Sequence, residues 1–410
     1  MTTTPLLARD LLATSSTRSG AASALAGLTV GVEEEFLLLD PVSGRPVPAA
    51  PALLGLLAGE PGPQAELMRF QFETATRVCT SLAQLRGELT RLRRLAATGA
   101  ETLGCRLVAS GIAPYGTSGL TLLTDRPRYR ELARRYPRLT AISGTCACHV
   151  HVGVPSRDVG VQVLARLRPW LAPLLAISAN SPIDGGRDTG WASRRYRNVS
   201  RWPTARPPAL WPDAIRYDGT VRRLIAKGAA IDDRSIYFLA RLSPHCPTVE
   251  VRVADVCPDI DTALLVAALI RALVATALTE TEAGAPLPIA PYGSVIAGLA
   301  AAARHGLAGT GVDPFTGEPT SQRNLLHRLL NHVGGALDAT GDRPDTDQLL
   351  TRLDRRGTGA ERQRTRWTRT RNPTEFVQAL SDITLTDPMP IRAKPRLTYP
   401  PAVSSPGAHP

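Results

Sequence analysis

Two glutamates set two residues apart mark the first segment of this chain that could do chemistry. They are Glu33 and Glu35 in Gly-Val-Glu-Glu-Glu-Phe at 31–36, and side chains two residues apart in a strand share one face. Glu34 and Phe36 then take the opposite face. Two aligned carboxylates repel each other, which raises the pKa of one of them unless a cation lies between them. Mg²⁺ or Mn²⁺ would remove that repulsion, so the spacing predicts a metal site.

Two later segments repeat the pattern. Glu73 lies in Phe-Gln-Phe-Glu-Thr-Ala-Thr at 70–76, and Glu250 and Arg252 alternate with valines at 248–256. An acid for a metal ion and a guanidinium for a phosphate oxygen are what phosphoryl transfer needs, because that reaction depends on charge neutralisation and positioning. Any one of these segments alone is typical of an ordinary half-buried strand with solvated charges. Three acid-centred faces together favour one metal–nucleotide site.

The segment 146–154, Cys-Ala-Cys-His-Val-His-Val-Gly-Val, holds four residues that could bind zinc. In a strand, however, Cys146 and Cys148 lie on one face while His149 and His151 lie on the other, so the four cannot converge on one ion. We expect the thiols to pack in the core, as free cysteines usually do. Whether either histidine contacts a ligand or is only a structural group stays open at this point.

A polar, arginine-rich loop is predicted over 178–208. Long loops of this kind inside a compact domain are uncommon and often functional. Arginines pair well with a carboxylate or with phosphates, whereas the alternative is a solvated surface loop. We predict that this loop contacts the substrate through Asn180, Arg195, Arg201 and Trp202.

Helices with apolar spacing of three and four residues must carry these strands. The pattern predicts helices over 82–104, 159–179 and 261–282, the first capped by Thr80 or Ser81, and the second bent at Pro169 or Pro173. A strand is expected at 106–110. Further helices are expected over 295–304, 322–337 and 347–355.

Composition indicates a globular protein. The chain has 410 residues, is 43% hydrophobic and carries a formal net charge of +12, and it is long enough to bury a large core. All basic residues except Lys227 and Lys394 are arginine, they are scattered along the chain, and aromatic residues make up only 5%. A nucleic-acid partner is therefore not expected, because that needs a basic patch with stacking rings. Small anionic substrates explain the arginines equally well.

Six cysteines occur in a chain without a signal-peptide pattern, which predicts reduced thiols and a cytoplasmic location. The longest apolar stretch, 262–278, carries Arg271 and falls short of the roughly 20 residues that a membrane span needs. We interpret it as a buried helix, and no membrane partner is expected.

The chain shows no internal repeat and no clear linker, so one α+β domain is expected over 28–385. Residues 1–27 are rich in Ser, Thr and Ala, and 386–410 are rich in proline. Both ends are predicted to be tails. The sequence leaves open whether the protein forms a homodimer.

The chain resembles a family of bacterial ATP-dependent carboxylate–amine ligases, glutamate–cysteine ligase type 2. The resemblance covers about 28 to 370 and rests on seven motifs in family order. They are the segment at 31–36, Glu-Thr-Ala-Thr-x-Val-Cys at 73–79, Cys-His-Val-His-Val-Gly-Val at 148–154, Ser-Ala-Asn-Ser-Pro at 178–182, Asp-Thr-Gly at 188–190, Arg-Trp-Pro-Thr-Ala at 201–205 and Pro-Thr-Val-Glu-Val-Arg-Val-Ala-Asp-Val at 247–256.

The resemblance implies a glutamine synthetase-like fold, a curved antiparallel sheet with helices packed on its outer face. It implies that ATP phosphorylates the γ-carboxylate of glutamate and that the amine of cysteine then attacks the acyl phosphate. The implied metal ligands for Mg²⁺ are Glu33, Glu35, Glu73 and Glu250. Arg252 would neutralise the transferring phosphate, and His151 would orient a substrate.

Three departures from the family pattern put the substrates in doubt more than the ATP chemistry. The family's Tyr-Trp-Asp-x-Arg-Pro-Ser is here Tyr-Phe-Leu-Ala-Arg-Leu-Ser at 237–243, Arg206 replaces a glycine, and the C-terminal motif survives mainly at 303–306. Weak activity on glutamate and cysteine, or a ligase for another acid and amine, is therefore expected. The rival hypotheses are, in order, a nucleotide-binding protein without ligase activity, a zinc hydrolase and a nucleic-acid binder.

Overall fold

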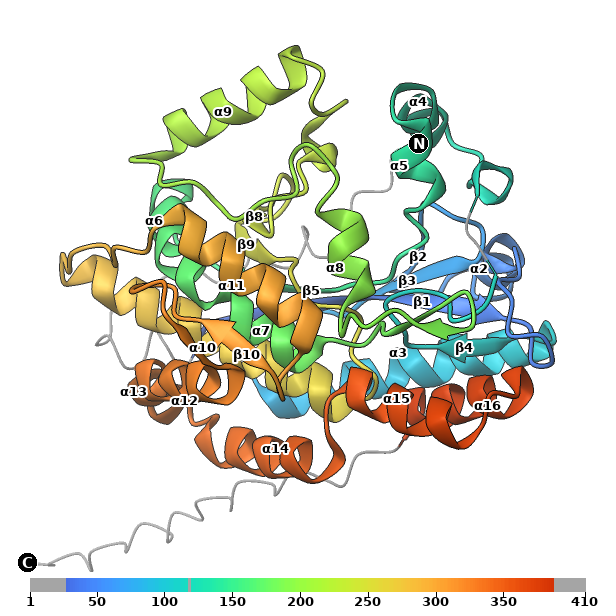
Figure 1. The fold of residues 1–410 in the computed structure, drawn as a ribbon. Coiled ribbons are helices and arrows are strands. Elements are labelled where there is room, and N and C mark those ends of the chain that lie inside the picture. Colours follow the sequence, from blue (N-terminus) through green and yellow to red (C-terminus); the bar gives the residue numbers. More distant parts are fainter. Residues whose placement is uncertain (1–26, 117–118, 387–410) are drawn as a thin grey trace, which may run out of the picture.

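The computed structural model describes residues 27–116 and 119–386, and these residues form an α+β architecture (Figure 1). Its centre is a seven-stranded antiparallel sheet in the order β2-β3-β1-β5-β9-β8, with β4 also pairing with β1. The strands are β1 Val30–Leu39, β2 Pro63–Ala65, β3 Gln71–Ala75, β4 Arg106–Val108, β5 Cys148–Gly153, β8 Ala240–Leu242 and β9 Thr248–Val251. All three segments with alternating acids therefore belong to one sheet, as the sequence predicts.

The strand predicted over 248–256 is shorter than expected. Regular pairing in β9 ends at Val251, although the Arg252 N–H still donates to the Leu239 carbonyl at 2.9 Å. The chain then pairs only through an isolated bridge between Ala147 and Asp255. The alternation itself is confirmed, because Val249 and Val251 lie in the core with exposures of 0%.

The long helices form close to where the sequence predicts them. Helix α3 spans Leu82–Thr102, and the Ser81 hydroxyl caps it by accepting from the Gln84 N–H at 3.2 Å. Helix α10 spans Ile260–Glu282 and is capped by the Asp259 side chain, which accepts from the Thr262 N–H at 2.9 Å. The helix expected over 159–179 is interrupted at Pro169, because proline lacks the N–H that an α-helix needs. It becomes α6 Arg157–Leu167, a 3₁₀ turn η4 Arg168–Trp170 and α7 Leu171–Ser178.

The predicted helix over 322–337 is two helices, α12 Gln322–His332 and α13 Gly334–Thr340, which meet at Val333. The helices expected over 295–304 and 347–355 are confirmed as α11 Tyr292–His305 and α14 Arg343–Arg356. The other α-helices are α2 Ala50–Leu56, α4 Pro127–Arg135, α5 Pro137–Ala141, α8 Arg194–Val199, α9 Ala214–Ala226, α15 Gly359–Arg369 and α16 Pro373–Thr384.

The segment 178–208 is not the structureless loop that the sequence predicts. It contains the short hairpin of β6 Ile183–Asp184 with β7 Arg187–Asp188, and then α8. A second small hairpin pairs β10 Thr310–Val312 with β11 Pro319–Ser321. The expected terminal segments, 1–27 and 386–410, lie outside the described residues except at positions 27 and 386.

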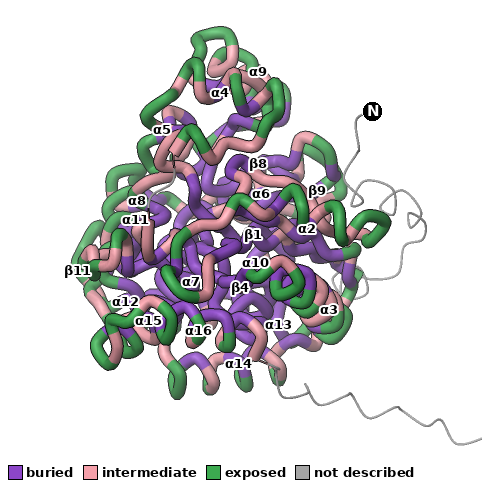
Figure 2. Tube along the Cα trace, turned by 90° about the vertical axis from the view of Figure 1, so that its right-hand side faces the viewer, coloured by how far each residue is buried: buried purple, intermediate pink, exposed green. Residues whose placement is uncertain are grey.

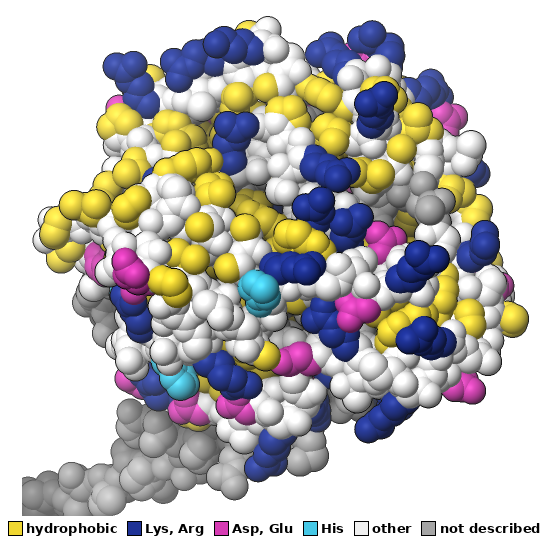
Figure 3. Space-filling model, viewed as in Figure 1, with side chains coloured by type: hydrophobic (Ala, Val, Ile, Leu, Met, Phe, Trp, Pro, Cys, Tyr) yellow, Lys and Arg dark blue, Asp and Glu magenta, His cyan; other side chains and the backbone are white. Residues whose placement is uncertain are grey.

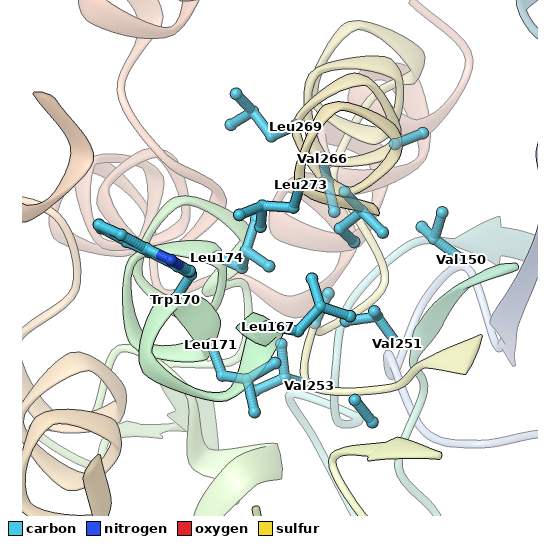
Figure 4. Packing of buried hydrophobic residues seen from close by; sticks show 14 of the residues in the cluster. Val150, Leu167, Trp170, Leu171, Leu174, Val251, Val253, Val266, Leu269 and Leu273 are labelled. Atoms are coloured by element: carbon cyan, nitrogen blue, oxygen red, sulfur yellow. The ribbon is translucent and has the colours of Figure 1, made fainter. Parts of the chain in front are cut away.

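Helices cover one face of the sheet and leave the other to the acidic side chains. Helices α3 and α10 contact β1, and α6 contacts β8 and β9. In Figure 2 the sheet and α10 are mostly buried, while α4 and α9 consist mainly of exposed and intermediate residues. Figure 4 shows the apolar layer in which side chains of the sheet, of α10 and of α6–α7 meet. In Figure 1, α9 and the α4–α5 segment rise on the opposite side of the sheet from α3 and α10.

Helix α10 is the one described helix that is long and apolar enough to cross a membrane. However, 83% of its most apolar window is buried inside the protein. Within it, the Arg271 guanidinium is 1% exposed and lies 2.7 Å from Asp342. The prediction of a buried helix over this stretch is confirmed.

A fully buried ion pair joins the sheet to α3. Glu34 points away from the acidic face, and its carboxylate receives two hydrogen bonds from the Arg93 guanidinium, at 3.0 Å and 2.5 Å. Both side chains are 1% exposed. Arg93 also donates to the carbonyls of Cys257 at 2.9 Å and of Thr384 at 3.0 Å. The pair therefore links β1, α3, the start of α10 and the end of α16.

Removing only one member of this pair should destabilise the protein strongly. Arg93→Met leaves the Glu34 carboxylate buried without its partner, which should lower the free energy of unfolding by about 3–5 kcal/mol. The double variant Glu34→Met/Arg93→Met should lose much less, because no charge then stays buried. Equilibrium unfolding in urea, followed by circular dichroism, measures both. Equal stability of Arg93→Met and the parent protein would contradict the structural role assigned to the pair.

Candidate functional site

A polar cavity of about 280 Å³ lies on the acidic face of the sheet, and we call it the central cavity. Strands β1, β3, β5, β8 and β9 supply its floor, and the start of α4 and the segment after β2 supply its sides. Its lining includes five carboxylates and five guanidiniums, which are Glu33, Glu35, Glu66, Glu73, Glu250, Arg126, Arg128, Arg234, Arg241 and Arg252.

The register of the strands brings the charged residues together. Glu35 on β1 lies opposite Glu73 on β3. On the other side of β1, Glu33 lies opposite His149 on β5. Residues directly opposite each other in an antiparallel pair point to the same face, with Cβ atoms about 4.5–5.5 Å apart. One further register pair, His151 with Glu250, extends the same face to β9.

Glu33, His149 and Glu250 form a group that could hold a metal ion. One ligand atom from each lies within 4.8 Å of the other two. Burial, and then the charge of Arg252, lower the pKa of His149 to about 4, so its imidazole is neutral at pH 7 and can offer a lone pair. Burial would raise the pKa of Glu250, but Arg241 and Arg252 outweigh it and hold that pKa well below its ordinary value. Two carboxylates and a neutral imidazole fit a divalent cation such as Mg²⁺ or Mn²⁺.

Glu35, Glu66 and Glu73 form a second acidic group beside the first. Burial, and then the charge of Glu66, raise the pKa of Glu35 to about 8. Burial and the charge of Glu33 raise the pKa of Glu73 well above its ordinary value. Upward shifts have the direction expected of carboxylates that lie where a cation binds. The metal role predicted for Glu35 and Glu73 fits this arrangement and stays a prediction.

Two arginines hold Glu250 from both sides. Arg241 donates to Oε2 of Glu250 at 2.8 Å and to its Oε1 at 3.2 Å. Arg252 also donates to Oε1. The Arg241 guanidinium was not assigned a role from the sequence, although its register opposite Glu250 places it on the same face. The arginine of the family motif is kept at 241 in the segment 237–243. However, nothing in a single sequence shows that this segment pairs with β9.

His151 lies beside Glu33. Its Nδ1 atom is 3.0 Å from the Thr248 hydroxyl, and its Nε2 atom is 3.5 Å from Glu33 Oε1. Nε2 is buried and makes no hydrogen bond within the described part of the chain. Burial lowers the pKa of His151, but the Glu33 charge outweighs it and the net shift is upward. An unused nitrogen on the cavity floor fits the ligand-orienting role predicted for this residue.

A second cavity, of about 90 Å³, adjoins the first, and we call it the small cavity. The two share Glu35 and Arg252 among their lining residues. Its far wall comes from α8 and the segment after it, through Arg195 and Trp202. The Arg195 guanidinium is 7% exposed, and its Nε–H has no hydrogen-bond partner among the described residues. Arg195 and Trp202, both predicted to contact the substrate, therefore lie next to the acidic site.

The buried Asp255 carboxylate positions this wall. It accepts from the Ser181 hydroxyl at 2.7 Å, from the Ser193 hydroxyl at 2.7 Å and from the Asn180 N–H at 2.9 Å. Ser193 in turn caps α8, the helix that carries Arg195. The conformation of the loop is therefore set by an acid at the end of the third acidic segment.

The structure does not bring Asn180 to either cavity. Its side-chain amide donates to the carbonyls of Ala109 and Val256, each at 2.9 Å, and accepts from Gln363 at 2.8 Å. Because the whole amide is engaged in these buried contacts, the predicted substrate contact does not fit this geometry. Arg201 is exposed and lines a separate cavity of about 180 Å³ on the other side of α8, so it does not reach the acidic site either.

The six cysteines are free and buried, as predicted. Cys146 and Cys148 are each 0% exposed, and each packs in a hydrophobic core cluster, Cys148 with Val150 and Cys146 with Phe72. Among the described residues, the group that could hold a metal contains no cysteine. The zinc site considered for 146–154 is therefore not supported.

Solved structures with the same fold are ligases. The chain superposes on a bifunctional glutathione synthetase from Pasteurella multocida with a TM-score of 0.63 and 14% identity, covering 88% of this chain but only 52% of that one. It superposes on a glutamate–cysteine ligase from Francisella tularensis, solved in complex with AMP, with a TM-score of 0.59, 13% identity and coverage of 89% and 90%. The fold is thus the glutamine synthetase-like ligase fold that the sequence predicts.

The chain belongs to glutamate–cysteine ligase family 2, whose family model matches residues 29–377. It is 43% identical to "Putative glutamate--cysteine ligase 2" of Salinispora arenicola over 83% of this chain and 90% of that protein. It is also 43% identical to "Putative glutamate--cysteine ligase 2-2" of Mycolicibacterium vanbaalenii over 88% and 98% of the two chains. The protein is therefore a ligase by family.

Replacing Glu250 should weaken metal binding without unfolding the protein. Glu250→Gln keeps the shape of the side chain but removes the charge that Arg241, Arg252 and the cation all need. Titration calorimetry with Mn²⁺ should then show an affinity at least about tenfold lower, equivalent to about 1.4 kcal/mol. Glu375→Gln, on the exposed surface of α16, is the matched control. Normal Mn²⁺ affinity in a folded Glu250→Gln protein would refute the metal assignment.

Proposed function

We propose that this protein is an ATP-dependent carboxylate–amine ligase, with glutamate and cysteine as its default substrates and γ-glutamylcysteine as the product. The observation that carries the proposal is the central cavity, where one sheet face gathers carboxylates for cations beside guanidiniums for phosphates. Phosphoryl transfer needs this equipment and no protein nucleophile. The names of the relatives and membership of the family support the same reaction.

The reaction has two steps. A carboxylate oxygen of the acid attacks the γ-phosphorus of ATP, the bond between that phosphorus and the bridging oxygen breaks, and ADP leaves. The uncharged amine then attacks the carbonyl carbon of the acyl phosphate, loses a proton, and expels inorganic phosphate. The net products are an amide, ADP, phosphate and one proton. Water must be kept from the acyl phosphate because it would hydrolyse it.

The residues of the chain fit the parts of this reaction. Glu33, His149 and Glu250 would hold one Mg²⁺ or Mn²⁺, and Glu35 and Glu73 would hold another. When bound, such ions would supply positive charge against the charge that develops on the phosphate.

Arg252 would neutralise the negative charge on the transferring phosphate. Burial disfavours its charged form, but Glu250 and the neighbouring glutamates outweigh burial and raise its pKa above the ordinary value. It is therefore a permanent cation at the cavity floor. Arg241, which holds the other side of Glu250, keeps that carboxylate in place.

The small cavity suits the amino-acid part of the reaction. Arg195 offers its buried Nε–H for a carboxylate, because its two other guanidinium nitrogens already donate to the carbonyls of Val253 at 3.3 Å and of Arg252 at 3.2 Å. Trp202 supplies an apolar wall, while its indole N–H is already engaged by the Ser143 hydroxyl at 3.0 Å. Glu35 and Arg252 connect this cavity with the phosphate region, so an acid held here lies next to ATP.

One lining residue favours a different acid and amine as the second candidate. Leu239 stands where the family pattern has an acid, and its side chain lines the small cavity. A leucine cannot pair with an ammonium group, whereas a carboxylate can. The small cavity is thus less suited to a substrate whose ammonium group needs a carboxylate partner at this position. A less polar amine is therefore the expected substrate.

The first test of the proposal is ADP release by the purified protein with ATP, Mg²⁺ and glutamate, with and without cysteine. Release that needs both amino acids, with γ-glutamylcysteine identified by mass, would support the default pair. ADP formed only with another acid and amine would keep the mechanism and change the substrates. Binding of ATP without release for any pair in a broad panel would favour a nucleotide-binding protein without ligase activity.

Arg195 should matter for substrate binding more than for the phosphoryl transfer itself. Arg195→Lys keeps the charge but loses the free Nε–H donor, so KM for the acid should rise by about tenfold or more while kcat falls less. Arg197→Lys on the exposed side of α8 is the control. Steady-state kinetics with the best acid and amine measures both parameters. An unchanged KM in Arg195→Lys would show that Arg195 does not bind the substrate carboxylate.

A further inference from the structure

The cavity of about 180 Å³ that Arg201 lines lies apart from the acidic site, and we call it the outer cavity. It shares no lining residue with the central cavity or with the small cavity. Its walls come from α8 and β6, and from the segments that precede β3, follow β4 and precede β5. None of the residues assigned above to metal ions or to phosphate lines it, so its chemistry has to be explained separately.

Helix α8 and the turn after it border the outer cavity on one edge and the small cavity on the next. Side chains four and then three residues apart share one edge of a helix. The edge that lines the outer cavity carries Arg194, Asn198 and Arg201. The neighbouring edge, one residue further along, lines the small cavity through Arg195, Val199 and Trp202.

A wall between the two cavities completes this separation. Ser143 and Thr145 line the small cavity, whereas Gly144 between them lines the outer cavity. The Trp202 indole N–H donates to the Ser143 hydroxyl at 3.0 Å and joins this segment to the turn after α8. A molecule in the outer cavity is therefore kept from the site of the proposed reaction.

The outer cavity offers a free cation and a half-used acid. The exposed Arg201 guanidinium forms no hydrogen bond or ion pair with any residue that the structure describes, and neither does the Asn198 side-chain amide. Asp184 Oδ2 accepts from the Arg194 Nε–H at 3.2 Å, while its Oδ1 has no partner among the described residues. Arg194 and Asp184 are 26% and 35% exposed, so a ligand can reach both.

The floor of the outer cavity is apolar. Phe70 is 0% exposed and Ile112 is 5% exposed, and Ile142 lies beside them in the lining. Burying a small apolar side chain on such a floor is favourable. The volume of about 180 Å³ lies below the roughly 300–1,000 Å³ of cavities that hold drug-sized ligands. The expected ligand is therefore small.

We propose that the outer cavity binds a small α-amino acid with an apolar side chain, as an effector apart from the acid and the amine that react. Arg201 would bind its carboxylate, Asp184 would accept from its ammonium group, and the floor would cover its side chain. A phosphate or a dicarboxylate fits less well, because Asp184 repels a second negative charge. In Figure 3, Lys and Arg side chains gather near the centre of the visible face, over α8, where they attract the carboxylate.

The effector role follows from α8 and rests on the proposed function. A ligand held by Asn198 and Arg201 restrains one edge of α8 and the turn after it. The neighbouring edge carries Arg195, which is proposed to bind the carboxylate of the reacting acid. An amino acid in the outer cavity should therefore favour binding of that acid, and the coupling is reciprocal.

Three probes test the site by titration calorimetry without ATP. They are L-valine, isovalerate, which lacks the ammonium group, and isobutylamine, which lacks the carboxylate. The parent protein should bind L-valine at least about tenfold more tightly than either analogue. Arg201→Gln should weaken L-valine binding by at least about tenfold. Arg355→Gln, at an exposed position of α14, is the matched control and should bind L-valine as the parent does.

Two further variants separate the parts of the site. Asp184→Asn should weaken the binding of L-valine but not of isovalerate, because only L-valine has an ammonium group. Arg195→Lys should leave L-valine binding unchanged, since Arg195 lies across the wall. Loss of binding in folded Arg195→Lys would place L-valine in the small cavity and overturn the inference. Parent-like affinity in Arg201→Gln, equal affinity for L-valine and isovalerate, or no binding of L-valine would also overturn it.

Steady-state kinetics with the best acid and amine tests the effector role. Saturating L-valine should lower KM for the acid by at least about fivefold in the parent protein and in Arg355→Gln, but not in Arg201→Gln. An unchanged KM while L-valine is bound would overturn that role. An amide containing valine, detected by mass, would show that the cavity feeds the reaction and would overturn its separation from the site. The calorimetry needs no turnover, so failure of the proposed function leaves the test of the binding site intact.

Discussion

The ion pair between Glu34 and Arg93 allows the central strand to carry three consecutive glutamates. A strand sends alternate side chains to opposite faces, so Glu34 must enter the core when Glu33 and Glu35 face the cavity. A carboxylate in the core is costly without a partner, and Arg93 of α3 supplies one with both side chains 1% exposed. Because Arg93 also binds carbonyls near α10 and α16, the same contact joins the sheet to the helices behind it.

On the acidic face of the sheet, the charges of the glutamates are only partly neutralised by the protein. This is the face where the chemistry is proposed to occur. Burial raises the pKa of Glu35 to about 8, while Arg241 and Arg252 keep Glu250 ionised. The protein thus neutralises Glu250 with its own cations and leaves Glu35 for the metal ions that are proposed to bind there. Such preorganised charge is the main contribution that a protein can make to phosphoryl transfer.

One departure from the family pattern lies on the side of the site where the amino acids are proposed to bind. Leu239 lines the small cavity, whereas the acids of the central cavity and Arg252 match the family motifs. Arg304, in the C-terminal motif, lies over the Trp191 ring, 5.3 Å from its centroid, and supports the loop rather than the cavities. Differences in substrate are therefore easier to reconcile with this structure than loss of the ATP reaction.

The sequence by itself determined the strands that bear the acids, the long helices and the shared face of Glu33 and Glu35, because two-residue and 3.6-residue periods are local properties of the chain. Tertiary structure alone decided which side chains meet across strands. It brought Arg241 and His149 to the acids through register, and it withdrew Asn180 into a buried amide network. It also shortened β9 and folded 178–208 around Asp255. These outcomes depend on contacts between residues far apart in the chain, which no local period encodes.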